Sequence, residues 1–248
     1  MALRIGFDMD GVLADFARAY REIEERVFGP AANATRPGDP EEDEAAESTR
    51  EAAQTTQDGA APPPAESAVP DPPASPQTLR RRRDVVWQTI QATPNFWTTL
   101  QPIDAGAVRR IHDLAARDGW DVFFITQRPA TDGESVQRQT QRWLVQEGFE
   151  LPSVLVIHGS RAEAARALRL DYLVDDSARN CIEVKAHAET RPLLVTNPAD
   201  ETTAESARRL GIGTVGSIVE ALDVIDQASL AKTHPTLLHR LAKLVRWE

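Results

Sequence analysis

Short β-rich runs and helix-like segments alternate along this sequence, outside one internal stretch. The runs consist largely of Val, Ile, Leu and aromatic residues, and they cover residues 3–7, 122–125, 154–157, 172–174 and 193–195, with a weaker one near Thr214. Between them, residues 105–117 and 135–147 have apolar side chains at helical spacing, and a glycine follows each pattern. Strands that alternate with helices build right-handed βαβ units on a parallel sheet. The sequence therefore predicts an α/β fold, with a Rossmann-like parallel sheet flanked by helices.

The internal stretch, residues 31–79, has a composition that does not support a packed core. It contains nine of the 17 prolines, and its ten acidic residues and two arginines contribute −8 of the net charge of −10. Up to residue 78 its single residue from the set Val, Ile, Leu, Phe, Met, Trp and Tyr is Val69. So little apolar surface cannot offset the entropy lost on ordering. We predict a disordered acidic, proline-rich insertion within a small helical cap region that spans residues 17–97.

The segments on either side of this cap region form the predicted core domain, residues 1–16 and 98–226. Residues 227–248 follow it as an amphipathic helix, because one stripe of that helix carries Leu237, Leu238, Leu241, Leu244 and Val245. Docking on the body of the protein, a homodimer contact and a membrane surface are the roles left open for this stripe. The arginine run at 80–83 is expected to begin a solvent-exposed helix, in preference to a nucleic-acid patch.

The composition of the whole chain restricts its class. Hydrophobic residues make up 41% and charged residues 27%, as is usual for a soluble globular protein. No cationic and apolar leader opens the sequence, and the apolar runs are far shorter than the roughly 18 residues of a membrane span. The single cysteine, Cys181, excludes an intramolecular disulfide. We therefore expect a cytoplasmic protein without a membrane span and without a nucleic-acid polymer as partner.

The tetrapeptide Asp8-Met9-Asp10-Gly11 directly follows the first β-rich run. A hairpin turn at Asp10-Gly11 is disfavoured, because the residues after Gly11 have helical apolar spacing. A calcium loop of the form D-x-[DN]-x-[DN]-G-x₅-E fails in both registers; starting at Asp8, for instance, puts Val12 and Leu13 at the fifth and sixth positions. A strand, the D-x-D-G turn and a helix remain, an arrangement in which both carboxylates can converge on one ligand.

Two further runs also end in polar residues. Thr126 follows the second run, where its hydroxyl and the next backbone N–H groups suit an anion, and Asp175 and Asp176 follow the fourth, where adjacent carboxylates repel unless a cation lies between them. Each has a simpler explanation alone, as a strand end, a solvated loop or a helix cap. Ligands of parallel sheets bind at the carboxyl ends of strands. Together these residues suit one phosphate and one Mg²⁺, whereas the lack of a Cys/His cluster disfavours zinc.

Three segments resemble a known family. The stretches "DMDGVLADF", "ITQRP" and "LDYLVDDSARN" are similar to motifs of the haloacid dehalogenase superfamily of aspartate-nucleophile phosphatases, and within it of the 5'(3')-deoxyribonucleotidase family. The resemblance covers residues 1–30 and about 94–220. It implies a Mg²⁺-dependent phosphomonoester hydrolase that forms an aspartyl-phosphate, with a small-molecule phosphate ester as its partner.

The resemblance also implies roles for individual residues. Asp8 would be the nucleophile, and Asp10 would be the general acid and then the general base. Mg²⁺ would be held by Asp8, the Asp10 carbonyl and Asp176, with Asp175 acting mainly through water.

The phosphate group and the nucleobase have their own implied contacts. Thr126 and Gln127 would bind phosphate, and Arg161, which stands where the family has a lysine, would do so as well. Phe16, with Phe96 or Trp97, would lie against the base; the alternative is that these rings belong to the core. The leading hypothesis is a 5'(3')-deoxyribonucleotidase. A phosphatase of another small metabolite and a non-catalytic phosphate-binding scaffold protein are the alternatives.

Overall fold

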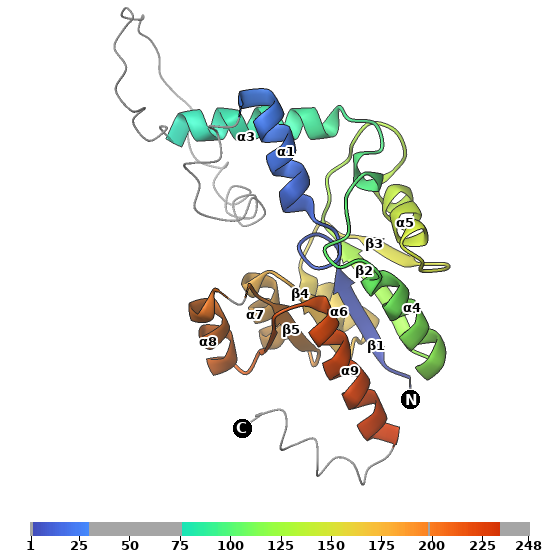
Figure 1. Cartoon of the computed structure of the whole chain (residues 1–248). Helices are drawn as coiled ribbons and strands as arrows, with labels where there is room; N and C mark the ends of the chain where they lie inside the picture. Colours follow the sequence, from blue (N-terminus) through green and yellow to red (C-terminus); the bar gives the residue numbers. More distant parts are fainter. Residues whose placement is uncertain (1, 30–75, 198, 234–248) are drawn as a thin grey trace, which may run out of the picture. The chain divides into compact units, whose positions relative to one another are not determined.

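The computed structural model describes residues 2–29, 76–197 and 199–233 (Figure 1). The described residues fall into two compact units, with boundaries after Phe16 and after Ile90. The predicted insertion therefore lies outside the described residues from 31 to 75, and so does the predicted C-terminal helix from 234 onwards.

The larger unit is built on one sheet of six parallel strands. The strands are β1 (Arg4–Asp8), β2 (Asp121–Thr126), β3 (Ser153–Val156), β4 (Tyr172–Asp175), β5 (Arg191–Val195) and β6 (Gly213–Val215). Their order is β3-β2-β1-β4-β5-β6, and each neighbouring pair is parallel. The predicted α/β fold with a Rossmann-like parallel sheet is confirmed.

Helices connect the strands and cover both faces of the sheet. They are η2 (Phe96–Thr98), α4 (Ala107–Asp118), α5 (Val136–Gln146), α6 (Arg161–Leu168), α7 (Ala178–His187), α8 (Glu201–Arg209) and α9 (Ile218–Thr233). The predicted helix signals act as expected at α4 and α5. Gly119 ends α4 in the left-handed conformation, and Ser135 caps α5 by accepting a hydrogen bond from the Arg138 N–H.

The pleat of β1 divides its side chains between two cores. Phe7 contacts Phe124 of β2, and the Phe149 ring lies between Phe124 and His112 of α4, at 4.9 and 5.4 Å between ring centroids. A side chain at Gly6 would face the opposite side of the sheet. There, side chains of the sheet pack with those of α6 and α7 in the cluster Ile125, Ala162, Ala165, Leu170, Leu173 and Val184. Both faces of the central strand are therefore buried, as expected for a parallel sheet.

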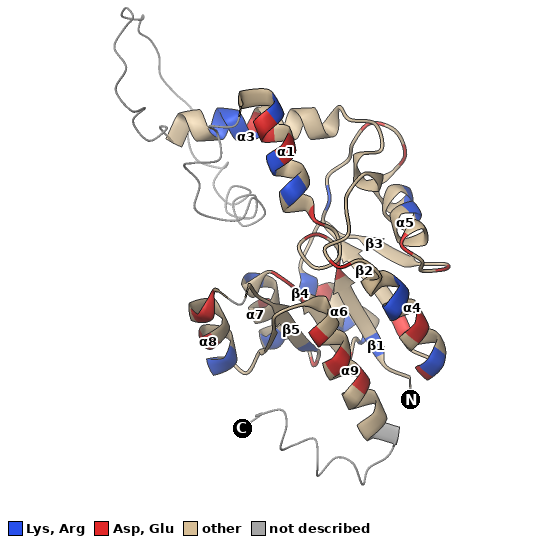
Figure 2. Ribbon diagram, in the orientation of Figure 1, with Lys and Arg blue, Asp and Glu red and all other residues tan. Residues whose placement is uncertain are grey.

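The smaller unit contains α1 and α3. Helix α1 covers Phe16–Phe28, so that its first residue belongs to the larger unit, and α3 covers Pro76–Gln91. Tyr20 and Trp87 meet edge to face at 6.1 Å between ring centroids, and the Arg82 guanidinium lies over the Phe28 ring. The arginine run at 80–83 was expected to begin a helix, but α3 begins earlier, at Pro76, and the run lies within it (Figure 2). Arg80 and Arg81 are exposed, as predicted, whereas Arg82 and Arg83 are partly buried.

In the part of the chain that the structure describes, no helix is both long and apolar enough to cross a lipid bilayer.

Gly6 leaves space for the side chains of Leu170 and of Leu173 in β4. A Cβ at this position would lie 2.7 Å from Leu170 Cδ1, a distance that real Cβ atoms essentially never show, and 3.0 Å from Leu173 Cδ1, which is tighter than most Cβ contacts. We expect Gly6→Ala to lower the free energy of unfolding by about 1–3 kcal/mol through overpacking. Chemical denaturation measures this, and Gly159→Ala, whose nearest neighbour is a flexible glutamate 3.7 Å away, is the control that should unfold like wild type.

Candidate functional site

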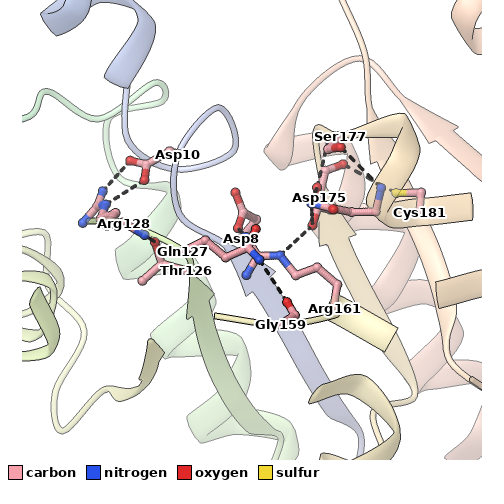
Figure 3. A network of polar contacts seen from close by, with 11 residues as sticks. Asp8, Asp10, Thr126, Gln127, Arg128, Gly159, Arg161, Asp175, Ser177 and Cys181 are labelled. Atoms are coloured by element: carbon pink, nitrogen blue, oxygen red, sulfur yellow. Dashed lines mark hydrogen bonds and ion pairs between the residues drawn. The ribbon is translucent and has the colours of Figure 1, made fainter. Parts of the chain in front are cut away.

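The carboxyl ends of three adjacent strands hold the polar residues of the candidate site. Asp8, Thr126 and Asp175 are the last residues of β1, β2 and β4, and β1 lies between the other two strands. All three side chains are buried. The parallel sheet therefore brings the predicted residues of three separate motifs to one edge (Figure 3).

Among the described residues, three carboxylates gather at this edge. One oxygen each of Asp8, Asp175 and Asp176 lies within 4.8 Å of the other two. Hard, oxygen-rich ligand sets of this kind suit Mg²⁺ or Ca²⁺ and offer no nitrogen or sulfur to zinc. The residues present therefore fit the cation that the sequence predicts.

Gly11 allows Asp176 to take its place in this cluster. Its φ is +79°, and a Cβ built on it would overlap the carboxylate of Asp176. Glycine is thus required at this position for two reasons: its backbone is left-handed, and a side chain would occupy the space of the Asp176 carboxylate. The predicted helix does not begin directly after Gly11. Residues 11–13 form turns and α1 begins at Phe16, because Leu13 and Asp15 first hydrogen-bond to the backbone of residues 101–103.

Arg161 lies against the carboxylate cluster. It is the first residue of α6, capped by Ser160, and its side chain is 5% exposed. Its Nη2 donates to Asp8 Oδ1, and its Nε lies 3.4 Å from Asp175 Oδ2. The arginine thus reaches two of the three clustered aspartates, at the position where the resemblance implies a lysine.

Burial shifts the acidity of two of these aspartates. It raises the pKa of Asp8 well above the ordinary value of 3.8; Arg161 opposes this, while Asp175 and Asp10 add to it. Burial also raises the pKa of Asp175, with Arg161, the Ser177 N–H and Asn180 acting in the opposite direction. Burial and crowding thus favour the protonated forms of these two carboxyl groups, and a bound cation would favour the ionised forms.

Asp175 is oriented by the start of the next helix. Its Oδ1 accepts hydrogen bonds from the Ser177 N–H at 2.9 Å and from Asn180 Nδ2 at 3.1 Å. Ser177 in turn caps α7 by accepting from the Asn180 N–H. These contacts fix the orientation of Asp175, a completely buried carboxylate near Asp8.

Asp10 lies apart from the cluster, in an ion pair with Arg128. The arginine donates from Nε to Oδ2 at 2.7 Å and from Nη2 to Oδ1 at 2.6 Å (Figure 3). Arg128 had no role in the sequence-based prediction. The available signal was its place in the loop after β2, since a cation there lies beside the carboxylates that follow the neighbouring strand β1.

The two predicted phosphate ligands from β2 differ in exposure. Thr126 is buried, and its Oγ1 accepts a hydrogen bond from the Arg128 N–H at 3.3 Å. Gln127 is exposed, and its Nε2 donates to the Gly159 carbonyl at 2.9 Å. Gln127 thereby links the loop after β2 to the loop that leads into Arg161, and the phosphate-binding roles stay predictions.

The predicted base-binding aromatic residues form one buried cluster. Ring centroids lie 6.4 Å apart for Phe16 and Phe96, 5.6 Å for Phe16 and Trp97, and 5.0 Å for Phe96 and Trp97. The Trp97 indole N–H donates to the Pro129 carbonyl, and its backbone N–H donates to Gln139. These contacts correspond to the core alternative, and the base-binding roles stay predictions.

Comparison with known proteins adds the fold family. No protein-family model matches the sequence, and no curated protein matches it by sequence. Among solved structures, the hydrolase SP0104 from Streptococcus pneumoniae, a haloacid dehalogenase-like family protein, is similar over 90% of this chain and 98% of its own, with a TM-score of 0.52 at 12% identity. This chain has the haloacid dehalogenase-like fold. The L-2-haloacid dehalogenase from Xanthobacter autotrophicus also matches, over 91% of this chain and 98% of its own, with a TM-score of 0.49 at 11% identity.

The haloacid dehalogenase-like fold is the one that the three sequence motifs imply, so this part of the resemblance is confirmed. At such identities the structural similarity concerns the fold alone. The narrower assignment to the 5'(3')-deoxyribonucleotidases stays a prediction.

Substitution of Gly11 tests its function in placing Asp176. We expect Gly11→Ala to weaken Mg²⁺ binding about 10- to 100-fold, as displacement of a metal-site residue does elsewhere. Isothermal titration calorimetry with Mg²⁺ measures this. Gly119→Ala is the matched control, since Gly119 also has a positive φ (+68°) but open space around its Cα. Both variants carry the left-handed strain of roughly 1–2 kcal/mol, and unchanged Mg²⁺ affinity in Gly11→Ala would contradict this function.

The raised pKa values of Asp8 and Asp175 predict how pH and Mg²⁺ act together. The folded state holds protons that the unfolded chain releases near pH 3.8, so without metal its stability falls as the pH rises from there through the folded pKa values. A cation competes with those protons. We expect Mg²⁺ to raise Tm more at about pH 8 than at about pH 5, measured by differential scanning calorimetry. Asp176→Asn should remove most of the difference, and equal Mg²⁺ effects at both pH values would refute this prediction.

Proposed function

We propose that this protein is a Mg²⁺-dependent phosphomonoester hydrolase that works through an aspartyl-phosphate. The observation that carries the proposal is the buried Asp8, in contact with Arg161 and within 4.8 Å of the Asp175 and Asp176 carboxylates. A nucleophilic carboxylate beside a fixed cation and a set of metal-binding oxygens is suited to phosphoryl transfer. The three motifs and the haloacid dehalogenase-like fold support the same reaction class.

Asp8 and Asp10 divide the reaction between them. Asp8 attacks phosphorus and the bond to the leaving oxygen breaks, while Asp10 gives that oxygen a proton. Asp10 then takes a proton from the water that attacks the aspartyl-phosphate, and Asp8 is released as a carboxylate. The separate surroundings of the two side chains, the carboxylate cluster for Asp8 and Arg128 for Asp10, support this division.

The remaining residues bind the charges of the reaction. Asp8, Asp176 and the Asp10 carbonyl would hold Mg²⁺, with Asp175, the third carboxylate of the cluster, acting mainly through water. When bound, the metal ion would offset the repulsion between the Asp8 carboxylate and an anionic phosphate ester. Arg161 balances charge at the same point through its guanidinium, and Thr126 and Gln127 offer donors from the neighbouring strand end.

We infer a deoxynucleoside 5'- or 3'-monophosphate as the substrate, on the resemblance of the motifs "DMDGVLADF" and "LDYLVDDSARN" to the deoxyribonucleotidases. Another small phosphate ester is the alternative. The burial of Phe16, Phe96 and Trp97 in one cluster favours that alternative, because rings packed on one another have less surface for a base.

Phosphate release tests the function directly. Wild type is incubated with and without Mg²⁺ against a panel of deoxynucleoside monophosphates and sugar phosphates, and free phosphate is measured. We expect release that requires Mg²⁺, abolished in Asp8→Asn and lowered about 10²- to 10⁴-fold in Asp10→Asn. The member hydrolysed with the highest kcat/KM identifies the substrate class.

A substitution of Arg161 tests its contact with phosphate. We expect Arg161→Ala to weaken binding of inorganic phosphate and to lower activity. Arg161→Lys keeps the positive charge and introduces the residue that the family has at this position, so we expect it to retain both. Arg138→Ala is the control, since Arg138 is an exposed arginine that pairs with Glu134. Phosphate affinity and activity unchanged in Arg161→Ala would show that Arg161 does not bind phosphate. Phosphate binding without any release by wild type would favour the scaffold alternative.

A further inference from the structure

Arg128 forms a two-point ion pair with Asp10 that is almost completely buried. The two side chains are 1% and 7% exposed, and each carboxylate oxygen accepts one hydrogen bond from the guanidinium. Two parallel hydrogen bonds between a planar fork and a carboxylate permit one relative geometry. The carboxyl group of Asp10 is therefore held in one direction, facing Arg128 (Figure 3).

The guanidinium of Arg128 is itself held by its surroundings. Its Nη1 donates to Thr140 Oγ1 at 3.1 Å, and its Cζ lies 4.7 Å from the centroid of the Trp97 ring. The Trp97 indole N–H donates to the Pro129 carbonyl at 3.0 Å, which ties the ring to the residue after Arg128. A planar guanidinium that is hydrogen-bonded and stacked on an aromatic face has little freedom. Asp10 is thus paired with an arginine side chain that is itself held in place, in the loop that follows β2.

The Arg128 fork leaves Asp10 able to exchange a proton. An ionised carboxylate has about four lone-pair sites, and the fork uses one site on each oxygen. The other sites remain for a proton taken from water or given to a leaving oxygen. Each oxygen of Asp10 therefore keeps an acceptor site at which a proton can bind, in the orientation that Arg128 sets.

We propose that Arg128 is a positioning residue for the acid–base chemistry of Asp10. This inference rests on the proposed function, in which the proton of Asp10 goes to the leaving oxygen as the P–O bond breaks, and Asp10 recovers a proton from the attacking water. Arg128 gives up no proton in either step. Its contribution is to hold the carboxyl group at the angle from which both transfers occur.

The leaving group separates this role from a purely structural one. An alkyl phosphate requires a proton at its leaving oxygen, whereas 2,4-dinitrophenyl phosphate releases a stable anion without one. Single-turnover rates of phosphoryl transfer to the enzyme are measured for wild type and Arg128→Lys, which keeps the charge and loses the fork. We expect the rate to fall about 10- to 100-fold for the alkyl phosphate that wild type hydrolyses fastest, and less than about threefold for the aryl ester, because general acid catalysis contributes about 10²- to 10⁴-fold.

Three further variants complete the experiment. In an Asp10→Asn background, Arg128→Lys should cause no additional loss with the alkyl ester. Thr140→Val removes one acceptor of the guanidinium and keeps the shape of the side chain, so we expect a smaller loss with the same dependence on leaving group, even where Arg128→Lys does not fold. Arg142→Lys is the control, since Arg142 is an arginine that pairs with Glu134 and is 58% exposed, and both rates should match wild type.

Two outcomes would overturn the inference. Equal losses of rate with both esters would mean that Arg128 supports folding or binds the phosphate group. A loss that persists in the Asp10→Asn background would mean that Arg128 does not act through Asp10. A wild type that releases phosphate from neither ester overturns the proposed function itself, together with this inference, so the two failures are distinguishable.

Discussion

The candidate site depends on balancing buried negative charge. Asp8, Asp10 and Asp175 are each at most 5% exposed, and an isolated charge in such surroundings costs several kcal/mol. Within the described residues, the arginines that are buried are Arg128 and Arg161, and both belong to this site. Arg161 contacts Asp8 and Asp175, and Arg128 contacts Asp10. The site is thus held together by two cations that reach it from different segments of the chain.

This pairing gives two aspartates of one short motif different surroundings. Asp8 ends β1 and shares its arginine with a neighbouring carboxylate, in a cluster that still has an excess of negative charge. Asp10 lies two residues later, beyond the strand, and has an arginine of its own. Two residues of separation across a strand end are enough to place one side chain in the carboxylate cluster and the other beside Arg128. The D-x-D-G sequence can therefore serve two chemical roles.

The strands and the residues at their ends were predictable from sequence. Runs such as 122–125 and 172–174 are short, rich in β-branched or aromatic residues and followed by polar side chains, so Thr126 and Asp175 fall at strand ends in both the prediction and the structure. Glycine at position 11 was recognised as a turn residue. Its second function, leaving space for Asp176, depends on a contact between residues 165 positions apart and has no local sequence signal.

Other parts of the site follow from tertiary packing. Arg128 is one arginine among many, and its pairing with Asp10 depends on β1 and β2 being neighbours in the sheet. Phe96 and Trp97 lie in a segment with little regular structure, where no periodicity distinguishes a buried ring from one that meets a ligand. The contact between Arg161 and Asp8 likewise joins residues 153 positions apart. Local patterns define the elements, whereas such contacts are defined by the order of the strands.

The setting of Trp97 has a consequence for how this protein can change in evolution. Its ring lies beneath Arg128, its indole N–H reaches Pro129, and its backbone N–H reaches Gln139, which is adjacent to Thr140. A substitution at position 97, 139 or 140 would therefore alter the support of Arg128 without approaching the carboxylate cluster. These positions should show epistasis, since a change that is tolerated at one of them depends on the residues at the others. Laboratory evolution of this protein would then accept substitutions there in compensating sets rather than singly.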